Sequence, residues 1–535
     1  MTLQVNNEKR NITRLTAAAL VLIILVWVLY VSFDRYETNK ATAEKMAQFV
    51  ALIQNNQYKD ARHVFEYLRD IKDGDQEKRA GQMKEIMKSK FGQFSREVLE
   101  GKSGPAELEK FRGLGLFQEQ FAVEMEAELA RVTDLYLQTA INYETAAYYY
   151  ETLQALGLNT QNINKYKLMA KAQDLKEKYK CREAMVILEK IAQDYPGDPL
   201  IAAKMAQYRE EEKKLVVYDG PIQHIFFHPL IAYPELAFDN DYISRGYDDY
   251  FITVKEFKKI LDSLYQKNFI LIDINSIFDE KTENGKKVLV KKELRLPRDK
   301  KPLIISIDDL NYYDYMLENG NVHKLVLDAR GNIATESVTP GGERVIAYDN
   351  EIVPILDEFV KKHPDFSFGG AKGVIALTGY QGILGYRTNE LDSPNYEQEK
   401  EEVLRVVKRL KETGWTFASH GYGHRDAAKI GYETLLRDTE RWKKEVETLV
   451  GPTRVYIYPY GSRVLPGEAK FQYLVEAGFR VLAAVGSAEY LKFTPGYIMM
   501  DRRHIDGIAF RYQRSRLLDL FDVKEIIDDV RPSKR

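Results

Sequence analysis

Cysteine is almost absent from this 535-residue chain, which contains only Cys181. A single cysteine excludes an intramolecular disulfide and any metal site built from several thiolates, so a metal would need histidine and carboxylate ligands. An excess of one charge is also lacking, because 78 basic residues are balanced by 80 acidic residues. This balance gives no reason to expect nucleic acid as a partner. The length predicts two or more domains.

Long uncharged apolar runs are lacking except near the N-terminus, where residues 15–33 read LTAAALVLIILVWVLYVSF. This run is long enough to cross a bilayer once as a helix. Three basic residues precede it closely, which predicts that residues 1–14 are cytoplasmic and that the rest of the chain is extracytoplasmic. The alternative is a cleaved signal peptide, with ATA at 41–43 as its cleavage site. Because the run exceeds a usual signal core and the small residues lie far beyond it, we expect an uncleaved anchor.

Proline is scarce and strand patterns are missing between residues 36 and 214, where Ala, Glu, Lys, Gln and Leu dominate. This composition predicts an all-α region. Two segments, YKDARHVFEYLRDI from Tyr58 and CREAMVILEKIAQDYPGDP from Cys181, each place a small alanine where two helices can approach closely. They resemble the second helix of a tetratricopeptide repeat, whose helix pairs stack. A plain bundle or stalk is the alternative, and either form could bind a protein partner.

Apolar strand-like runs alternate with amphipathic helical patterns over residues 220–515, which predicts an α/β domain. Two polar stretches, 276–300 and 318–346, contain turn-like sequences and are expected to be inserted hairpins. Residues 516–535 are expected to be a C-terminal tail. In a βα barrel, side chains at the carboxyl ends of different strands face one cleft, so residues remote in sequence can share a site. The expected strands contain HIFFHPLI, FILIDI, PLIISIDDL, GVIALTGY, WTFASHG, RVYIYPYG, FRVLAAVG and YIMMDRRHID.

Three of these strands end in residues that could bind a metal or take part in catalysis. One ends in Asp308 and Asp309, and adjacent buried carboxylates need a cation or a proton to relieve their repulsion. Another leads into HGYGH, where His420 and His424 have the i, i+4 spacing that places two imidazoles on one side of a helical turn, as zinc sites require. The third ends in YPYG at 458–461, a tight turn that could direct backbone N–H groups inward. Each motif alone also fits an ordinary turn or loop.

In this order, a DD pair, an H-x-x-x-H and a PYG motif resemble the polysaccharide deacetylase family, also called the NodB-homology or carbohydrate esterase family 4 domain. The resemblance covers roughly residues 220–512 and implies a distorted (β/α) barrel. It implies that Asp309, His420 and His424 hold a divalent metal, most often zinc, although Co²⁺, Ni²⁺ and Fe²⁺ suit the same ligands. Asp308 would be the general base that deprotonates a metal-activated water for attack on an N-acetyl carbonyl.

The resemblance implies two further roles. The metal and the backbone N–H of Tyr460, after Pro459, would stabilise the oxyanion. A histidine on a late strand would protonate the leaving amine, and His504 is the candidate because the step needs a proton donor that works near neutral pH. The sequence DRRHIDG could equally place Asp501 or Arg503 in the cleft, with His504 in a structural contact.

The chain departs from the family pattern at two positions. Leu310 stands where the first motif usually has glycine, and Ile457 stands where the third motif usually has an arginine that orients the base. Either Arg425 or Arg502 could replace that arginine.

Two other features are expected near the cleft. His228 follows the first barrel strand, where similar deacetylases carry a Tyr-His or Phe-His pair. It could bind sugar, brace the metal ligands or be a buried strand-end histidine. The stretch LTGYQGILGYRTN (377–389) combines glycines and tyrosines, a composition suited to stacking on sugar faces, with a long ordered loop as the alternative.

Together with the expected anchor, the resemblance implies a membrane-anchored, extracytoplasmic metal-dependent deacetylase that acts on N-acetylated sugars of a cell-envelope or secreted polysaccharide, such as peptidoglycan or poly-N-acetylglucosamine. The lack of disulfides is compatible with an envelope protein. One alternative is a catalytically silent glycan-binding scaffold, which the missing third-motif arginine favours and the intact Asp308 opposes. Another is an O-acetyl esterase, because the same metal and base serve both reactions.

Overall fold

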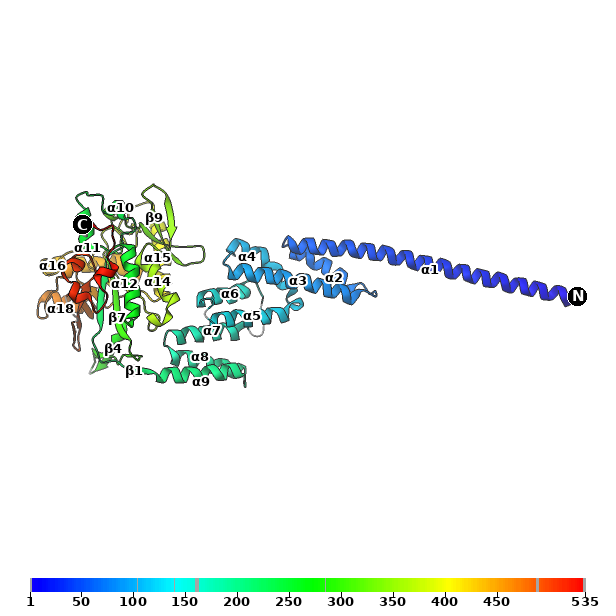
Figure 1. Cartoon of the computed structure of the whole chain (residues 1–535), viewed down its shortest axis with the longest axis horizontal. Coiled ribbons are helices and arrows are strands. Elements are labelled where there is room, and N and C mark those ends of the chain that lie inside the picture. The colour runs from blue at the N-terminus through cyan, green and yellow to red at the C-terminus, as the bar shows by residue number, and fades with distance from the viewer. Residues whose placement is uncertain are drawn as a thin grey trace. The chain divides into compact units, whose positions relative to one another are not determined.

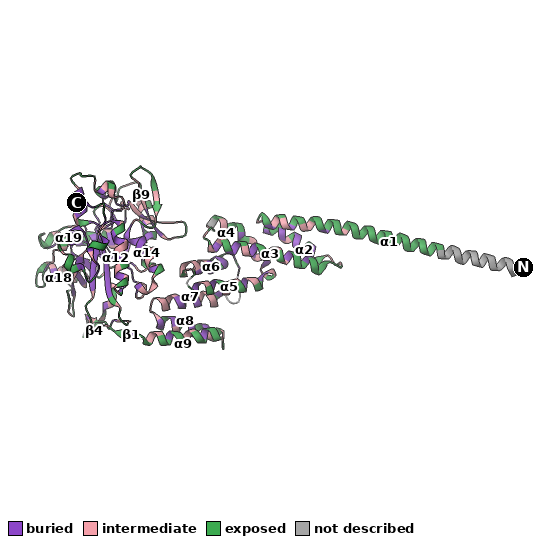
Figure 2. Cartoon of the chain, viewed as in Figure 1, coloured by how far each residue is buried: buried purple, intermediate pink, exposed green. Residues whose placement is uncertain are grey.

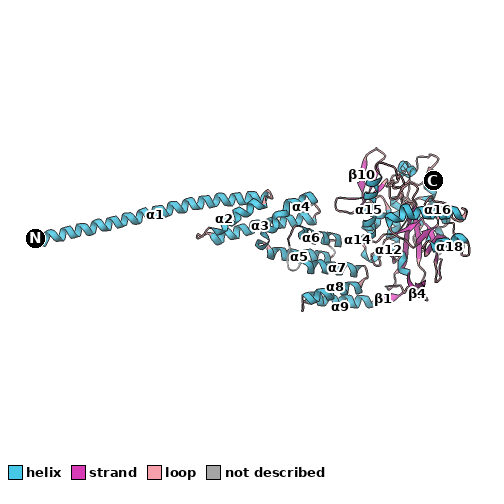
Figure 3. Cartoon of the chain, turned by 180° about the vertical axis from the view of Figure 1, so that it is seen from behind, coloured by secondary structure: helices cyan, strands magenta, loops and turns pink. Residues whose placement is uncertain are grey.

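The computed structural model divides into two compact units, residues 1–171 and 172–535, and each unit is described by itself. Unit 1 is built from helices, and the strands lie in unit 2 (Figures 1 and 3). The structure describes residues 2–102, 104–138, 140–158, 163–283, 285–486 and 490–532.

Helix α1 (Thr2–Gln54) changes character along its length. From residue 20 to 33 its large apolar side chains are exposed (Figure 2), and the helix is long and apolar enough to cross a membrane. A signal sequence near the N-terminus can have the same length and apolar composition. Further along, Phe49 and Ile53 are buried in the core of unit 1. The ATA triplet at 41–43 therefore lies inside a helix that continues into a packed region.

The core of unit 1 is rich in aromatic side chains. In α2 the buried residues, among them Ala61 and Phe65, recur at helical spacing on one face, as expected of an amphipathic helix. The rings of Phe49, Phe65 and Phe117 lie 5.7–6.1 Å apart. The remaining helices of this region are α2 Tyr58–Asp70, α3 Gln76–Leu99, α4 Pro105–Phe111, η1 Arg112–Gln120, α5 Ala122–Leu137, α6 Tyr143–Ala155 and α7 Ile163–Glu177, which crosses the boundary between the units. The predicted helical character is confirmed, while the likeness to tetratricopeptide repeats stays a prediction.

Unit 2 contains a closed barrel of seven parallel strands, which confirms the predicted (β/α) barrel. Around the barrel the order is β2, β7, β11, β12, β13, β14 and β16, and β16 pairs with β2 to close it. Each strand coincides with an apolar run expected to be a strand. The strands are β2 Gln223–Phe227, β7 Lys301–Asp308, β11 Val374–Leu377, β12 Thr416–Ser419, β13 Val455–Ile457, β14 Val481–Val485 and β16 Ile498–His504.

Side chains alternate across the barrel wall. On β7, Leu303, Ile305 and Ile307 belong to the core between the barrel and its outer helices, whereas Ile304 belongs to the interior core. The same alternation turns Asp308 inward. The helices of this unit's outer layer and loops are α10 Pro234–Ala237, α11 Ser244–Tyr250, α12 Val254–Gln266, α13 Asp314–Glu318, α14 Ile352–Lys362, η3 Pro364–Phe366, α15 Tyr396–Glu412, α16 Tyr432–Trp442, η4 Lys443–Glu447, α17 Thr448–Val450, η5 Pro459–Gly461, α18 Ala469–Glu476 and α19 Gly507–Tyr512.

Apolar side chains close the amino end of the barrel. Phe278, Leu289 and Leu296 pack in one cluster with the first inward residues of the strands, such as Ile304 and Val374. The two stretches expected to be hairpins contain β4–β5 and β8–β9–β10, which pair antiparallel. Their bounds, and those of the other small elements, are β1 Leu215–Val217, β3 Phe269–Leu271, η2 Ile274–Ile277, β4 Phe278–Glu283, β5 Lys286–Lys291, β6 Arg295–Pro297, β8 Lys324–Leu327, β9 Ile333–Val338, β10 Arg344–Ala347 and β15 Leu491–Phe493.

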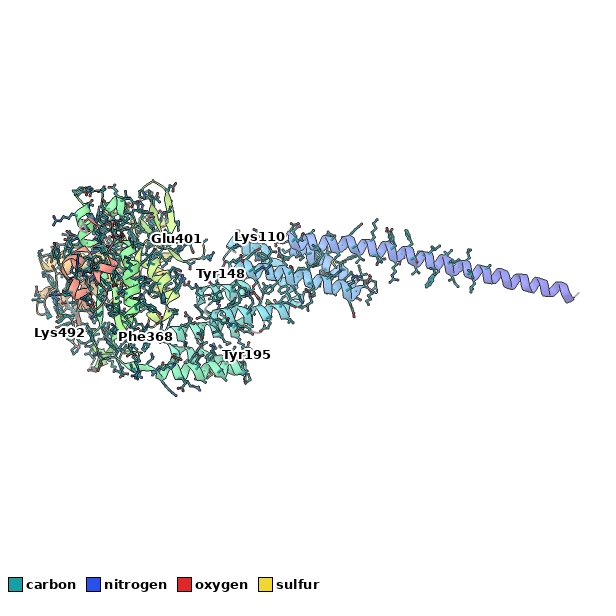
Figure 4. All side chains as sticks on the ribbon, in the orientation of Figure 1. Lys110, Tyr148, Tyr195, Phe368, Glu401 and Lys492 are labelled. Carbon is teal, nitrogen blue, oxygen red and sulfur yellow. The ribbon has the colours of Figure 1, made fainter. Side chains whose placement is uncertain are left out.

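Two helices of the expected helical region belong to unit 2. They are α8 (Cys181–Asp194) and α9 (Pro199–Lys213), which pack against each other. Just before α8, Tyr179 stacks on Phe368, which is labelled in Figure 4. The N–H of Gly369 also donates a hydrogen bond of 2.8 Å to the carbonyl of residue 178. The start of this helical pair is therefore fixed to the barrel.

The last part of the chain, expected to be a tail, is packed against the barrel. It includes α20 (Arg514–Leu517) and α21 (Val523–Ile526), and Phe521 between them is fully buried. The guanidinium of Arg531 is fully buried and contacts the carboxylates of Glu256 and Asp248 at 2.6–3.0 Å. Such a buried ion pair needs both partners in place, so residues up to 532 are part of the folded unit.

Candidate metal centre and catalytic site

Two neighbouring carboxylates begin the site at the end of β7. Asp308 is the last residue of the strand and points into the barrel. Asp309 adopts a left-handed backbone with φ of 60°, and its N–H donates to the carbonyl of Ala376 on β11 at 3.2 Å. This turn lets consecutive side chains both face the site, although they would otherwise alternate. Both carboxylates are buried.

The histidine pair lies in a loop between β12 and α16. The helical turn that the spacing suggested is not observed, because residues 420–424 are non-helical and both Gly421 and His424 have positive φ, of 66° and 48°. Asp438 on α16 holds the loop by accepting hydrogen bonds from the N–H groups of residues 422 and 423, at 2.7 and 2.9 Å. The imidazole centroids of His420 and His424 lie 5.0 Å apart. A loop with two left-handed residues, rather than a helical turn, therefore brings the two imidazoles together.

Three of these side chains form a set suited to a divalent metal. One ligand atom each from Asp309, His420 and His424 all lie within 4.8 Å of one another. Nδ1–H of His420 donates to the carbonyl of Ile457 at 2.8 Å, so Nε2 is the unprotonated nitrogen, and it lies 3.9 Å from the Asp308 carboxylate. Burial lowers the pKa of His420 despite the nearby carboxylates, which favours the neutral form that binds metals. Two imidazoles and one carboxylate fit Zn²⁺ and similar ions.

Tyr313 holds the carboxylate of this set. Its hydroxyl donates to Oδ1 of Asp309 at 2.6 Å and lies 2.7 Å from the hydroxyl of Thr378. Oδ2 of Asp309 faces His424, at 3.5 Å from Nε2. Burial and the Asp309 charge raise the pKa of Tyr313 well above its ordinary value, so the hydroxyl remains a donor. Sequence reasoning missed Tyr313, because a tyrosine in a loop gives no signal of the atom it contacts.

Arg502 pairs with Asp308 through two hydrogen bonds, of 2.6 and 2.9 Å. Burial alone would raise the pKa of Asp308, but Arg502 and His420 lower it to about 2. Arg425, the other arginine considered for this position, is 57% exposed and lies 3.7 Å from Asp438. Of the two, Arg502 is the one that contacts the expected base. Alternation along β16 is the sequence signal that places Arg502 on the inward face of its strand.

His504 lies one inward position beyond Arg502 on the same strand. The register pairs it with Phe226 of β2, whose ring packs on the Arg502 guanidinium at 4.2 Å and lies 6.4 Å from the His504 ring. Nδ1 of His504 contacts Asp506 at 2.7 Å, and Nε2 contacts the side-chain amide of Gln513 at 2.7 Å. The Asp506 carboxylate can only accept there, so it fixes the proton on Nδ1.

The alternatives to His504 on this strand face the other side of the barrel wall. Asp501 forms an ion pair with Arg463. Arg503 is paired in register with Ile225, an outward residue, and contacts Asp519 at 2.7 Å. Neither is therefore directed at the Asp309–His420–His424 set.

His228 follows β2 and lies close to both carboxylates. It contributes to lowering the pKa of Asp308 and of Asp309, which places it at the same end of the barrel. Its Nδ1–H donates to the carbonyl of Tyr250 at 3.0 Å, which leaves Nε2 as the acceptor nitrogen.

Tyr460 adjoins the histidine pair from the YPYG turn. Its ring centroid lies 4.7 Å from that of His424, and 69% of the residue is exposed. Its backbone is left-handed, with φ of 58°, directly after the buried Pro459. A non-glycine residue in this conformation is uncommon and is found more often at functional turns.

Comparison with known proteins gives one family and one similar structure. Residues 392–482, which contain the histidine pair and the YPYG turn, match the family model described as polysaccharide deacetylase. The Streptococcus pyogenes deacetylase PplD in complex with acetate is 11% identical, with a TM-score of 0.31, over 54% of this chain and 94% of that chain. No curated protein sequence matches the chain. Over residues 392–482 the chain is therefore similar to the polysaccharide deacetylase family.

Proposed function

We propose that this chain is a membrane-anchored, metal-dependent enzyme that removes N-acetyl groups from amino sugars of a cell-envelope or secreted polysaccharide. The observation that carries the proposal is the position of Asp308. It lies beside the Asp309–His420–His424 set without belonging to it, and Arg502 fixes its orientation. A purely structural metal site has no need of a second, separately oriented carboxylate.

Asp309, His420 and His424 would hold the metal, with Zn²⁺ as the first candidate and Co²⁺, Ni²⁺ or Fe²⁺ as alternatives. A divalent ion at this position supplies Lewis acidity to the amide carbonyl and to water. Tyr313 and the carbonyl of Ile457 orient two of the ligands, as hydrogen-bond partners of metal ligands commonly do.

The protein residues would then manage the protons. Asp308 accepts a proton from the attacking water as the water oxygen bonds to the acetyl carbon, and its low pKa keeps it in the acceptor form at neutral pH. The carbon–nitrogen bond breaks, and the amine nitrogen takes a proton from Nε2 of His504, which must first leave Gln513. Nε2 would take up that proton from solvent once it is free of Gln513, while Asp506 holds the proton on Nδ1. The products are acetate and a free amino sugar, and the N–H of Tyr460 would stabilise the oxyanion.

Acetate release tests this proposal. The full chain in detergent, loaded with Zn²⁺, is incubated with N-acetylglucosamine oligomers and with peptidoglycan. We expect His424→Ala to lose both the metal and turnover, whereas Asp308→Asn keeps the metal and loses at least about 100-fold in turnover. Asp349→Asn, an exposed carboxylate paired with Lys258, is the matched control and should keep full activity.

Three outcomes would replace the proposal or part of it. Full activity of Asp308→Asn would remove Asp308 from the reaction. Absence of acetate release from a fully metal-loaded chain, with retained glycan binding, would instead support a glycan-binding scaffold. Release of acetate from O-acetylated but not from N-acetylated sugars would identify an esterase.

A further inference from the structure

Two tyrosines that stack on Tyr313, namely Tyr315 and Tyr380, have no part in the proposed reaction. Tyr313, whose hydroxyl holds Asp309, has its ring stacked with those of Tyr380, at 4.9 Å and 25°, and Tyr315, at 6.0 Å and 30°. Tyr313 is buried, whereas Tyr315 is 40% exposed and Tyr380 is 37% exposed. One aromatic stack therefore reaches from the ligand Asp309 to the surface.

The two loops that carry these rings are fixed to each other. Arg387 donates to the carbonyls of Tyr312 and Gln381, each at 3.0 Å, and to the Asp314 carboxylate at 2.9 Å. The N–H of Asp314 also donates to the side-chain carbonyl of Gln381 at 2.9 Å. These bonds join the loop after β7 to the glycine- and tyrosine-rich loop after β11.

The second loop is also held in a conformation that requires glycine. Gly382 has φ of 78°, and a Cβ there would lie 1.9 Å from the carbonyl oxygen of Tyr386. The N–H of Tyr380 donates to the carbonyl of Tyr422, inside the HGYGH loop, at 3.2 Å. Tyr380 is thus positioned by the same loop that supplies the histidines. The rings are preorganised, so binding a ligand would not require them to be ordered first.

We propose that Tyr315 and Tyr380 form a platform that binds a gluco-configured pyranose ring next to the sugar whose acetamide is cleaved. This inference rests on the proposed function. Half-exposed aromatic rings offer an electron-rich face, and a gluco-configured pyranose presents a face of axial C–H groups that complements it. An axial hydroxyl, as in a galacto-configured sugar, interrupts that face. The substrate is accordingly a glycan chain of gluco-configured units rather than a single amino sugar.

Binding can be measured without turnover in the full chain carrying Asp308→Asn and loaded with Zn²⁺. Titration calorimetry with chitotetraose should show affinity about 3- to 10-fold weaker when Tyr380→Ala or Tyr315→Ala is added. N-acetylglucosamine itself, which fills only the reacting position, should bind equally to all variants. A tetramer of N-acetylgalactosamine should bind weakly and be insensitive to both substitutions.

Tyr432→Ala is the matched control, because Tyr432 is 39% exposed and also has an aromatic neighbour, Tyr473, at 5.9 Å. It should leave chitotetraose affinity unchanged. Tyr380→Leu keeps apolar volume while removing the ring, and it replaces Tyr380→Ala if that variant does not retain one zinc per chain.

Chitotetraose affinity within twofold of the parent in both platform variants would overturn the platform. Equal weakening of N-acetylglucosamine and chitotetraose would also overturn it, because the residues would then act at the reacting position. These results are separate from the reaction itself. Acetate release that is insensitive to Tyr380 leaves the deacetylase proposal standing, and tyrosine-dependent binding without acetate release leaves the platform standing.

Discussion

The two ends of the barrel interior differ in chemistry although the same strands build both. At the amino end, inward residues such as Ile304 and Val374 pack with the apolar side chains of the β4–β5 hairpin. At the carboxyl end of β7, four residues beyond Ile304 and on the same face, Asp308 is buried against Arg502. One end stabilises the fold by burying apolar surface, and the other places charges where burial is unfavourable unless they are paired.

A layer of polar side chains separates the apolar end of the barrel interior from the charged end. His224 lies in it with Nε2 3.0 Å from the hydroxyl of Ser306 and Nδ1 3.0 Å from the sulfur of Met500. Ser306 in turn accepts from Arg502 at 3.1 Å. Burial lowers the pKa of His224 well below its usual value, so this layer is polar but neutral. Among the described residues of the barrel interior, the Asp308–Arg502 ion pair therefore lies at the carboxyl end, beside the Asp309–His420–His424 set.

The largest effect should come from breaking the charged end. Arg502→Met leaves the Asp308 carboxylate buried without its partner, and we expect a loss of about 3–5 kcal/mol in the free energy of unfolding. Urea unfolding followed by fluorescence can measure it, because Trp415 and Trp442 are buried in this unit. Arg425→Met, at the exposed arginine, should lose less than about 1 kcal/mol. Equal losses in the free energy of unfolding for the two variants would show that the Arg502–Asp308 ion pair stabilises the fold no more than an exposed arginine does.

The next largest effect should be a pH dependence of the free energy of unfolding that comes from a buried carboxyl group. Burial raises the pKa of Glu351 to about 8, although the carboxyl accepts the N–H of Leu230 at 3.2 Å and of Ile352 at 2.6 Å. Below about pH 4.5, Glu351 is protonated in both the folded and the unfolded protein. Between about pH 4.5 and 8 it ionises only in the unfolded protein, so the free energy of unfolding falls as the pH rises. Glu351→Gln removes this fall. The difference in the free energy of unfolding between Glu351→Gln and the parent should therefore grow, in favour of the variant, by about 1 kcal/mol for each unit that the pH rises.

Unfolding experiments at pH 5, 6, 7 and 8 measure that advantage. Glu358→Gln is the control, since Glu358 is half exposed and pairs with Lys361 at 2.8 Å. A constant difference between Glu351→Gln and the parent over this range would contradict the raised pKa.

Metal affinity tests the charged end without breaking its ion pair. Tyr313→Phe removes the hydrogen bond to Asp309, and we expect Zn²⁺ to bind about 10- to 100-fold more weakly in chelator competition. Tyr473→Phe, which loses a hydroxyl contact to a helix carbonyl, should bind Zn²⁺ as the parent does. Unchanged affinity in Tyr313→Phe would mean that Asp309 is oriented without the tyrosine.

The smallest effect belongs to the apolar end. Ile304→Val removes one methyl group from the interior core and should lower the free energy of unfolding by about 0.5–1.5 kcal/mol. Zn²⁺ affinity should not change, because the site lies at the other end of the strand. Altered affinity in this variant would show that the two ends are coupled through the intervening layer.

Much of the fold follows from local sequence patterns. The apolar runs predicted the barrel strands, because a buried strand needs consecutive apolar residues whatever its neighbours are. The motifs could be placed at strand ends for the same reason. The conformation of HGYGH could not be predicted, since the loop depends on Asp438 from the following helix. The docking of the C-terminal segment was equally hidden, because its stability comes from Arg531 and a buried Glu256 275 residues away.

By itself the sequence determined the strands, the motif order and the residue types that a metal and a base require, because periodicity and composition act locally. Tertiary structure alone decided which arginine serves Asp308, as Arg502 is 194 residues away and reaches it only when β16 closes the barrel against β2. It also decided that Tyr313 holds Asp309 and that two loops align a row of tyrosines beside it. Contacts of this kind depend on long-range packing, which no local pattern encodes.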